Sequence, residues 1–381
     1  MDITILNNEK QIKSLTTAIF WVRFLHGIVS MAWVTTASYV ISHYSGASNI
    51  NYYSAIGAVL VLIMLLFFIN KEKKQKVLLT LMTIYSFTLF NIGISPSTAT
   101  FIIFSSIAIC ETGLSGISLS LICELNKDKI LKYICYQSLV YGLGAGVGSV
   151  IFYNIINNAS WNMVYVASAV IMIISLIIFA LAISKNKIQL EEEKNSDDPA
   201  SAQIKQLLSD RSVVITLAAL FLITCSYYFT YSVFYSAGSN TIALLSIASL
   251  VSLIFTPIYF KNRDLLKSYF WFIMSAGALI LCANALYNTV TLALAAVAFG
   301  LMYGAAFPVL VSRICESNEN KIARIIVLAF FATEISYVFN LFKQNVVSSD
   351  LRLYLLISSI LLLFAAAALY TISKPKELKR Q

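Results

Sequence analysis

The sequence predicts an all-α integral membrane protein with twelve transmembrane helices in two six-helix bundles. Three observations carry this prediction: an apolar composition, twelve long apolar runs, and basic residues confined to alternate loops. Of the 381 residues, 59% are hydrophobic and 12% are charged, and the mean hydropathy is +0.80. Soluble domains carry about 25% charged residues. A soluble fold could not hide so much apolar surface, whereas a bilayer removes the need to hide it.

Each apolar run is long enough to cross a bilayer, which takes about 20 mostly apolar residues. The first run is too long for a cleaved signal peptide and contains Arg23 and His26, so we expect it to be retained. The twelve runs are 16–41, 51–70, 77–94, 97–124, 133–157, 162–184, 212–237, 239–260, 267–286, 288–312, 323–346 and 351–373.

Basic residues fall in every second loop. The loops at 43–50, 95–96, 157–161, 237–240 and 286–288 contain none. The last outer loop, between the eleventh and twelfth runs, has only Lys343 and Arg352 flanking it. Cytoplasmic loops are enriched in Lys and Arg, so both termini are predicted to be cytoplasmic. These residues would lie beside the anionic lipids of the inner leaflet, which accounts for the net charge of +9. Nucleic acid is therefore not needed as a partner to explain that charge. The basic set is Lys71, Lys73, Lys74, Lys76, Lys127, Lys129, Lys132, Lys185, Lys187, Lys194, Lys205, Arg211, Lys261, Arg263, Lys267, Arg313, Lys321 and Arg324, with Lys10, Lys13, Lys374, Lys376, Lys379 and Arg380 near the termini.

A long polar segment divides the chain into two halves. We expect an N-terminal six-helix bundle at 1–184, a cytoplasmic linker at 185–211 and a C-terminal bundle at 212–381. The linker mixes both signs of charge, and its part from Ile204 to Leu208 favours a short amphipathic helix on the membrane surface. A short basic loop follows the second run of each half, which suggests two repeats related by an axis along the membrane normal.

Four ionisable residues lie inside the apolar runs. Each charge in a bilayer costs about 2.5–3.5 kcal/mol on insertion scales, so Arg23, His26, Glu111 and Glu334 each require an explanation. Glu111 and Glu334 are near the middles of their runs, roughly 15–20 Å from the helix ends. That depth is where secondary transporters bind substrates and coupling ions.

Small polar residues extend these positions into stripes on the first and fourth runs. We expect Glu111 to pair with His26 or Arg23, and proton binding at a glutamate to be linked to solute movement. Two plainer interpretations stay open: Arg23, about 10 Å from the cytoplasmic end, reaches that surface, or Glu111 and Arg23 form a static packing pair. The stripe residues are Ser30, Ser115 and Ser118.

Tyrosines and amides mark the second half. Tyr227, Tyr231 and Tyr235 recur every four residues and share a face. They either line a cavity for an organic solute or pack the bundle, with Tyr235 as an interfacial anchor. Tyr337 and Asn340 lie near Glu334 in the sequence and extend the polar region there, with the same two interpretations.

Glycines are spaced for close helix contact. Gly142 with Gly146, and Gly144 with Gly148, form two overlapping G-x-x-x-G pairs, which favour helix packing. In the tenth run, the paired glycines and the following proline are interpreted as a packing site and a kink. These three residues are Gly300, Gly304 and Pro308.

The sequence contains no motif for a catalytic, ATP-driven or metal-dependent protein. There is no G-x-x-x-x-G-K-[ST] loop and no H-E-x-x-H, only two histidines occur, and the six cysteines are scattered. The loops are short and the acids are isolated at mid-depth. We therefore expect no enzyme activity, no cofactor and no metal site.

Four stretches resemble the major facilitator superfamily. "FGLMYGAAFPVLVSRICE" (299–316) resembles that family's tenth helix, the stretch 141–171 its fifth and sixth helices with a Trp-containing turn, and "CETGLSGISLSLICEL" (110–125) the fourth helix of some members. The basic loops 71–76 and 261–267 fall where the family has a loop of Gly, Asp and Arg or Lys. "NKEKKQK" lacks the glycines and the Asp-Arg pair, so no gating role is carried over to it.

This resemblance implies a transporter in which helices 1, 4, 7 and 10 line a central cavity. We expect a proton-coupled secondary carrier of a small organic solute that works by alternating access, as a multi-pass monomer in the inner membrane of a bacterium. The aromatic residues lean slightly to efflux of amphipathic or siderophore-like compounds. A nutrient importer, for example for an amino acid, is the alternative. A channel or non-transporting sensor of the same fold is the alternative of another class.

Overall fold

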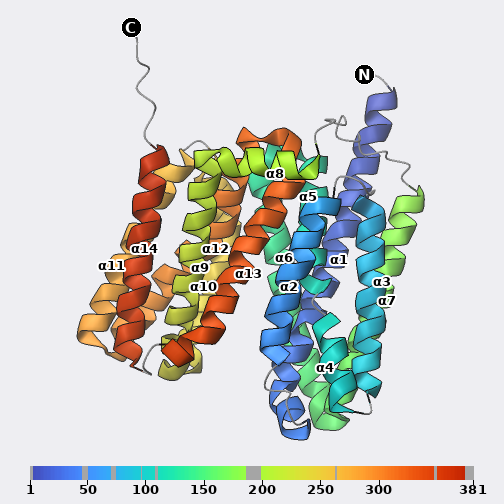
Figure 1. Ribbon diagram of the computed structural model, residues 1–381, viewed down its shortest axis with the longest axis horizontal. Coiled ribbons are helices and arrows are strands. Elements are labelled where there is room, and N and C mark those ends of the chain that lie inside the picture. The colour runs from blue at the N-terminus through green and yellow to red at the C-terminus, as the bar shows by residue number, and fades with distance from the viewer. Residues whose placement is uncertain are drawn as a thin grey trace. The chain divides into compact units, whose positions relative to one another are not determined.

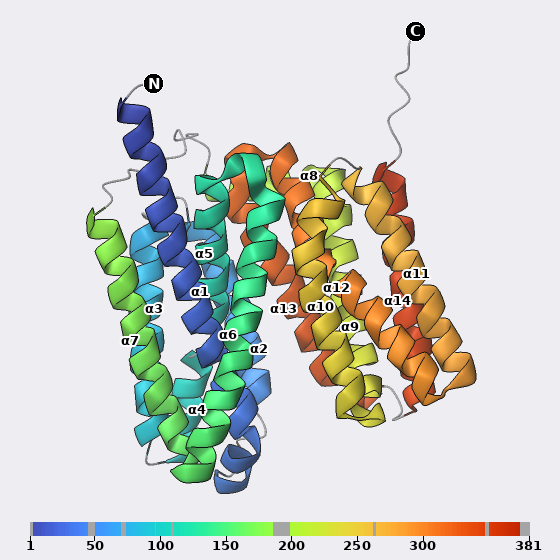
Figure 2. The same ribbon diagram turned by 180° about the vertical axis from the view of Figure 1, so that it is seen from behind.

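The computed structural model describes residues 3–44, 50–69, 74–95, 97–107, 110–185, 199–261, 264–346 and 350–373. Regular structure within these ranges is entirely helical. Eleven of the described helices are long and apolar enough to cross a membrane, and Tyr52–Phe68 is a shorter apolar helix. Together they match the twelve predicted runs one for one. The helices separate into two compact units (Figures 1 and 2), which are described in turn.

The first unit contains most of the described chain up to Ala202, together with Ile322–Phe330. The predicted fourth run corresponds to two helices, α4 and α5, and residues 108–109 between them lie outside the described residues. Both ribbon views place α4 toward the end of this unit that is opposite the N-terminus. The helices are α1 (Ile3–His43), α2 (Ile50–Phe68), α3 (Lys74–Ile94), α4 (Thr98–Ile107), α5 (Cys110–Leu125), α6 (Ile130–Asn158) and α7 (Trp161–Lys185).

Helix α5 lies at the centre of the first unit and contacts α1, α2 and α3, while α7 packs against α1 and α3. Almost all of α5 from Gly113 to Cys123 is buried, because small Gly and Ser side chains alternate with Leu and Ile. At one end, Lys74 of α3 forms an ion pair with Glu124 of α5, which fixes the ends of these helices together.

Helices α1 and α6 approach closely through glycines. A methyl group at Gly144 would lie 2.1 Å from the carbonyl oxygen of Phe24, and one at Gly148 would lie 2.4 Å from that of Ile28. A methyl group at Gly146 would meet nothing within 4 Å. Gly146 therefore does not have the packing role predicted for it, and the close approach to α1 is made by Gly144 and Gly148 instead.

The second unit contains most of the chain from Gln203 onward, so the division falls inside the predicted linker. The amphipathic helix expected near its end is α8, which buries Gln203 and Leu207. Arg324, counted above with the basic loops, lies instead in the first turn of α13, in the part of that helix that belongs to the first unit, with only 2% of its surface exposed. The helices are α8 (Ala200–Ser209), α9 (Arg211–Ala237), α10 (Ser239–Tyr259), α11 (Leu265–Leu286), α12 (Thr289–Ser317), α13 (Ile322–Val346) and α14 (Leu351–Ser373).

The second unit repeats the packing of the first. Helix α14 packs against α9 and α11, as α7 packs against α1 and α3, and α12 contacts α9, α10 and α11, as α5 contacts α1, α2 and α3. Glycines again permit a close approach: methyl groups at Gly300 and Gly304 would lie 2.5 and 2.4 Å from the carbonyl oxygens of Leu245 and Ser249 on α10. Pro308 is buried inside α12, and the kink expected there stays a prediction.

Buried hydroxyls join equivalent helices in both units. Thr36 of α1 and Tyr165 of α7 are 2.9 Å apart between their oxygens. Ser358 of α14 lies 2.6 Å from the hydroxyl of Ser226 and 2.5 Å from that of Thr230, both on α9. Each contact satisfies hydroxyls that have no water available in the core.

Candidate functional site

The first unit gathers three of the predicted intramembrane charges in one cluster. Arg23 and His26 lie one turn apart on α1 and face α5, where Glu111 and Ser115 are also one turn apart. The Nε2 atom of His26 is 3.5 Å from Oε1 of Glu111. An Arg23 Nη1 atom is 2.9 Å from Nδ1 of His26 and donates to Ser115 Oγ at 2.8 Å. Arg23 is 6% exposed and bonds inward, so it does not reach for the cytoplasmic surface.

The contacts of His26 fix which of its nitrogens carries the proton. A guanidinium has only donors, so Nδ1 of His26 must accept the bond from Arg23. The imidazole proton of the neutral ring is then on Nε2, directed at Glu111. Arg23 thereby orients His26 toward the carboxylate and supplies the one positive charge of the cluster, which balances Glu111.

Two tyrosines complete the surroundings of Glu111. Tyr141 of α6 donates to Oε1 at 3.1 Å, and Tyr85 of α3 donates to Oε2 at 3.4 Å. The Arg23 guanidinium also lies 4.5 Å from the centre of the Tyr141 ring. Glu111 is 33% exposed whereas His26 is 1% exposed, so the carboxylate is the accessible end of a buried chain of polar groups.

The other predicted polar residues of this unit lie beside the cluster. Ser118 donates to the carbonyl of Ser115 and accepts a bond of 3.0 Å from Gln137 of α6. Ser30 donates to the carbonyl of Gly27 and is half-buried. Tyr85, Tyr141 and Gln137 are not among the residues predicted from the sequence. The glycines of the run 133–157, which contains Tyr141 and Gln137, indicate helix packing and give no sign of a polar site there.

The second unit gathers aromatic side chains instead of opposite charges. Tyr227 of α9 and Tyr303 of α12 stack with their ring centres 4.2 Å apart and their planes 12° apart. Phe299 continues the stack, 6.0 Å from Tyr303 and nearly parallel to it. Tyr231 lies 5.6 Å from Tyr227, while Tyr235 one turn further on is 69% exposed and is suited to an interfacial position.

Glu334 of α13 is the acid of this aromatic cluster. Its carboxylate interacts electrostatically with the hydroxyls of Tyr228, Tyr303 and Tyr337. The rings of Tyr228 and Tyr337 are 5.6 Å apart. The structure thus brings together Glu334, Tyr227 and Tyr337 from the predicted set, and adds Tyr228, Tyr303 and Phe299. Asn340, also predicted here, is half-buried with its side-chain oxygen enclosed.

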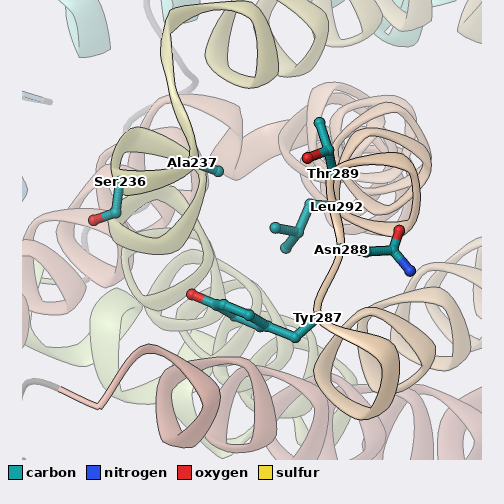
Figure 3. A pocket seen from close by; sticks show the side chains of 6 residues that line it. All are labelled: Ser236, Ala237, Tyr287, Asn288, Thr289 and Leu292. Carbon is teal, nitrogen blue, oxygen red and sulfur yellow. The ribbon is translucent and has the colours of Figure 1, made fainter.

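A separate pocket of about 320 Å³ lies where α9 meets α10 and α11 meets α12. Figure 3 shows the Tyr287 ring extending from the connection between α11 and α12 toward α9. This connection is well defined, since the side chain of Asn288 caps α12 and the Arg352 guanidinium lies 5.1 Å from the Tyr287 ring. The pocket is at the helix ends, away from the mid-span acids. Its lining residues are Ser236, Ala237, Tyr287, Asn288, Thr289 and Leu292.

Among the described residues, no group of three His, Cys, Asp or Glu side chains could hold a metal ion. The first cluster contains one carboxylate paired with a histidine, and the second contains one carboxylate among aromatic rings.

Comparison with solved structures identifies the same architecture in known transporters. The fold matches an E. coli fucose:proton symporter variant, FucP, with a TM-score of 0.77 at 12% identity over 96% of this chain and 98% of that one. It matches the proton:xylose symporter XylE with a TM-score of 0.71 at 13% identity over 96% and 97%. It matches the human organic anion transporter MFSD10 with a TM-score of 0.72 at 11% identity over 94% and 99%.

No curated protein matches the chain by sequence. The sequence pattern of the Major Facilitator Superfamily, however, matches residues 19–340, which contain the second to tenth apolar runs in full and most of the first and the eleventh. The resemblance noted from the sequence is therefore confirmed, and so is the helical architecture. The chain belongs to the Major Facilitator Superfamily of membrane transporters.

Proposed function

We propose that the protein is a proton-coupled secondary transporter of a small organic solute, working by alternating access. The observation that carries this proposal is the partly exposed Glu111 carboxylate, held in mid-span by His26, Tyr85 and Tyr141. A carboxylate placed this way can exchange a proton on its open side while its partners hold it in place.

Proton binding at Glu111 would change the balance of the cluster. Hydrogen bonds to a charged carboxylate are roughly twice as strong as bonds between neutral groups, so protonation weakens the bonds from Tyr141 and Tyr85. It also removes the negative charge that attracts Nε2 of His26, 3.5 Å away. It also leaves the buried Arg23 charge without its counter-charge. A ligand shifts a two-state equilibrium by its differential affinity for the two states. The proton would in this way bias the carrier between its outward- and inward-facing states.

The moving parts in this proposal are the two predicted bundles, 1–184 and 212–381, joined by the linker 185–211. Carriers of this kind rock one repeat against the other around a site near the bilayer middle. We place both termini in the cytoplasm because the basic loops are all on that side. We assign the protein to a bacterial inner membrane as a monomer.

The coupling is tested in proteoliposomes with an imposed pH gradient. We expect Glu111→Gln to abolish the response of transport to the gradient while counterflow of unlabelled against labelled solute persists. Glu124→Gln is the matched control, because that acid pairs with Lys74 at the helix end and should keep coupling. If Glu111→Gln and Glu334→Gln both leave transport and its pH dependence unchanged, proton coupling through these acids is excluded.

The solute and its direction are tested by comparing metabolites in spent medium of strains with and without the protein. The aromatic cluster of the second unit favours an amphipathic solute, so we propose efflux. A compound missing from the knockout's medium would support an exporter, and one left unconsumed would establish an importer. Flux that excess solute on the opposite side fails to stimulate would indicate a channel, and no difference in any compound would favour a sensor.

A further inference from the structure

We infer that Tyr141 changes its hydrogen-bond partner when Glu111 binds a proton, from the Glu111 carboxylate on α5 to the Ser30 hydroxyl on α1. This inference rests on the proposed proton coupling and names the residues that set the pH range in which Glu111 takes up its proton. Tyr141 and Ser30 are positioning residues, because they act through Glu111.

The Tyr141 hydroxyl lies near acceptors on two different helices. It donates to Oε1 of Glu111 at 3.1 Å, and the Ser30 hydroxyl is a second group close enough to interact with it. The proton of Ser30 is already used, since this hydroxyl donates to the carbonyl oxygen of Gly27 at 2.8 Å. A hydroxyl has one proton and two lone pairs, so Ser30 Oγ is able to accept a bond from Tyr141.

While Glu111 is charged, its carboxylate is the stronger of the two acceptors. Bonds to an ionised group are roughly twice as strong as bonds between neutral groups. A carboxylate also has no proton to give, so Tyr141 has to be the donor. The same oxygen, Oε1, lies 3.5 Å from Nε2 of His26, so groups from α1 and α6 converge on it.

Protonation reverses the bond between Glu111 and Tyr141. The carboxyl group then has a proton to donate, and Nε2 of His26, which carries a proton itself, cannot accept it. The Tyr141 oxygen accepts it once the phenol proton has turned toward Ser30. A continuous chain then runs from Glu111 through Tyr141 to Ser30 and ends at a backbone carbonyl of α1. Hydrogen bonds in such a chain polarise and strengthen one another.

This exchange of partners needs no movement of the helices. Helices α1 and α6 are in contact at this level, because a methyl group at Gly27 would lie 2.2 Å from the carbonyl oxygen of Tyr141. The Tyr141 ring is held as well, with the Arg23 guanidinium 4.5 Å from its centre and the centre of the His26 ring 5.6 Å away. Rotation of one phenol proton about its C–O bond is therefore enough.

The other groups around Glu111 do not offer the same exchange. The guanidinium of Arg23 on α1 has only donors. Helix α2 meets this part of α5 with the apolar side chains of Val61 and Leu65. Tyr85 on α3 donates to the other carboxylate oxygen, Oε2, at the longer distance of 3.4 Å. Tyr85 is therefore expected to affect proton binding in one direction only, and less strongly than Tyr141.

The test is a titration of the Glu111 carboxyl group by infrared difference spectroscopy, in the purified full-length protein in lipid nanodiscs without any solute. Glu111→Gln, or Glu111→Asp should the first variant fold poorly, identifies the band that is followed against pH. Tyr141→Phe removes the bond to the charged form, so the midpoint of protonation should move to higher pH by about one unit. Ser30→Ala removes the acceptor used in the protonated form and should move the midpoint to lower pH by about half a unit.

The double variant separates an exchange of partners from two independent contacts. Because Ser30 acts only through the Tyr141 hydroxyl, Ser30→Ala combined with Tyr141→Phe should titrate like Tyr141→Phe alone. Tyr85→Phe should give a smaller upward shift. Ser149→Ala is the matched control for Ser30→Ala, because the Ser149 hydroxyl also donates to a carbonyl of its own helix, at 3.0 Å, and its loss should leave the midpoint unchanged.

Two results would overturn the inference. One is a shift in the same direction for Tyr141→Phe and Ser30→Ala, and the other is a Ser30→Ala effect that persists when Tyr141→Phe is also present. Failure of the proposed coupling looks different. Opposite shifts in a protein whose transport ignores a pH gradient would support the exchange and reject the coupling. Transport that follows the gradient, with no effect of Ser30→Ala on the midpoint, would keep the coupling and reject the exchange.

Discussion

The two units share one helix packing arrangement but differ in the charged groups that they bury. In the first unit, Arg23, His26 and Glu111 from two contacting helices form a connected, electrically balanced chain. In the second unit, a single acid, Glu334, lies among tyrosine and phenylalanine rings from α9, α12 and α13. Because the two units share this packing pattern, the contrast described here comes from their side chains.

This difference is consistent with different roles for the two clusters in the proposed carrier. A balanced cluster responds strongly to a change of one charge, because adding a proton leaves its buried arginine uncompensated. An aromatic cluster with one acid offers ring faces and hydroxyls to an organic solute. In the proposed carrier, the first cluster would therefore bind protons and the second would bind the solute. Three further changes would break or sharpen that contrast.

The largest effect is expected from a substitution that pushes apart the two helices, α1 and α6, that hold residues of the first cluster. Gly144→Ala places a methyl group 2.1 Å from the carbonyl oxygen of Phe24, so α6 must move away from α1 and carry Tyr141 off Glu111. Overpacking of cores typically costs about 1–3 kcal/mol, and contact with rigid backbone lies at the upper end. We expect a large loss of folded protein, measured by thermal unfolding with size-exclusion detection.

Gly146→Ala is the matched control for that variant. It lies two residues along the same helix, and its added methyl group would meet nothing within 4 Å. It should unfold at the temperature of the unmodified protein or slightly above, since alanine favours helix over glycine. Equal damage from both variants would show that the contact with α1 is not the cause of the loss, since only Gly144→Ala places a methyl group against that helix.

An intermediate effect is expected from removing the positive charge of the first cluster, so that it contains an acid but no arginine, like the cluster of the second unit. Arg23→Gln leaves Glu111 without its counter-charge and frees Nδ1 of His26, so we expect transport to fall at least tenfold and the protein to unfold at lower temperature. The double variant Arg23→Gln with Glu111→Gln restores neutrality and should recover thermal stability but not coupling. A double variant no more stable than the single one would show that the charges do not balance each other.

The smallest effect is expected from the hydroxyl contacts that both units share. Thr36→Val removes one buried contact between α1 and α7, and Ser358→Ala removes two between α9 and α14. Hydrogen bonds between membrane helices average about 0.6 kcal/mol, so Thr36→Val should lower stability by about that amount and Ser358→Ala by about twice as much. Reversible unfolding in mixed micelles measures it, and transport by both variants should stay close to normal.

The spans could be predicted from the sequence because apolar length is a local property. The predicted eleventh run, 323–346, differs from α13 (Ile322–Val346) by one residue, for instance. The rotation of each helix about its axis is not local. Gly144 and Gly146 are two residues apart and therefore about 200° apart around the helix, and only the tertiary structure decides which faces α1. Apolar content also does not predict that Arg324 is buried at the start of α13.

The clusters were predictable only in part, for the same reason. Charged residues in apolar runs are conspicuous, so Arg23, His26, Glu111 and Glu334 were found directly. Tyr85, Tyr141 and Tyr303 were not, because tyrosine is common at membrane depth and its role depends on which neighbouring helix its hydroxyl reaches. The one available signal was Tyr303 at four residues from Phe299, which places both rings on one face of α12.

The bond from Arg23 to Nδ1 of His26 prevents His26 from passing a proton onward from Glu111. An imidazole passes protons along a wire only when each of its nitrogens can take part, one receiving while the other releases. Here one nitrogen is occupied by a guanidinium that has no proton acceptor, and the ring is almost fully enclosed. His26 is therefore the closed end of a path. In the proposed carrier, a proton bound to Glu111 could therefore leave only from the accessible side of the carboxylate, and its release across the membrane would require the change between outward- and inward-facing states.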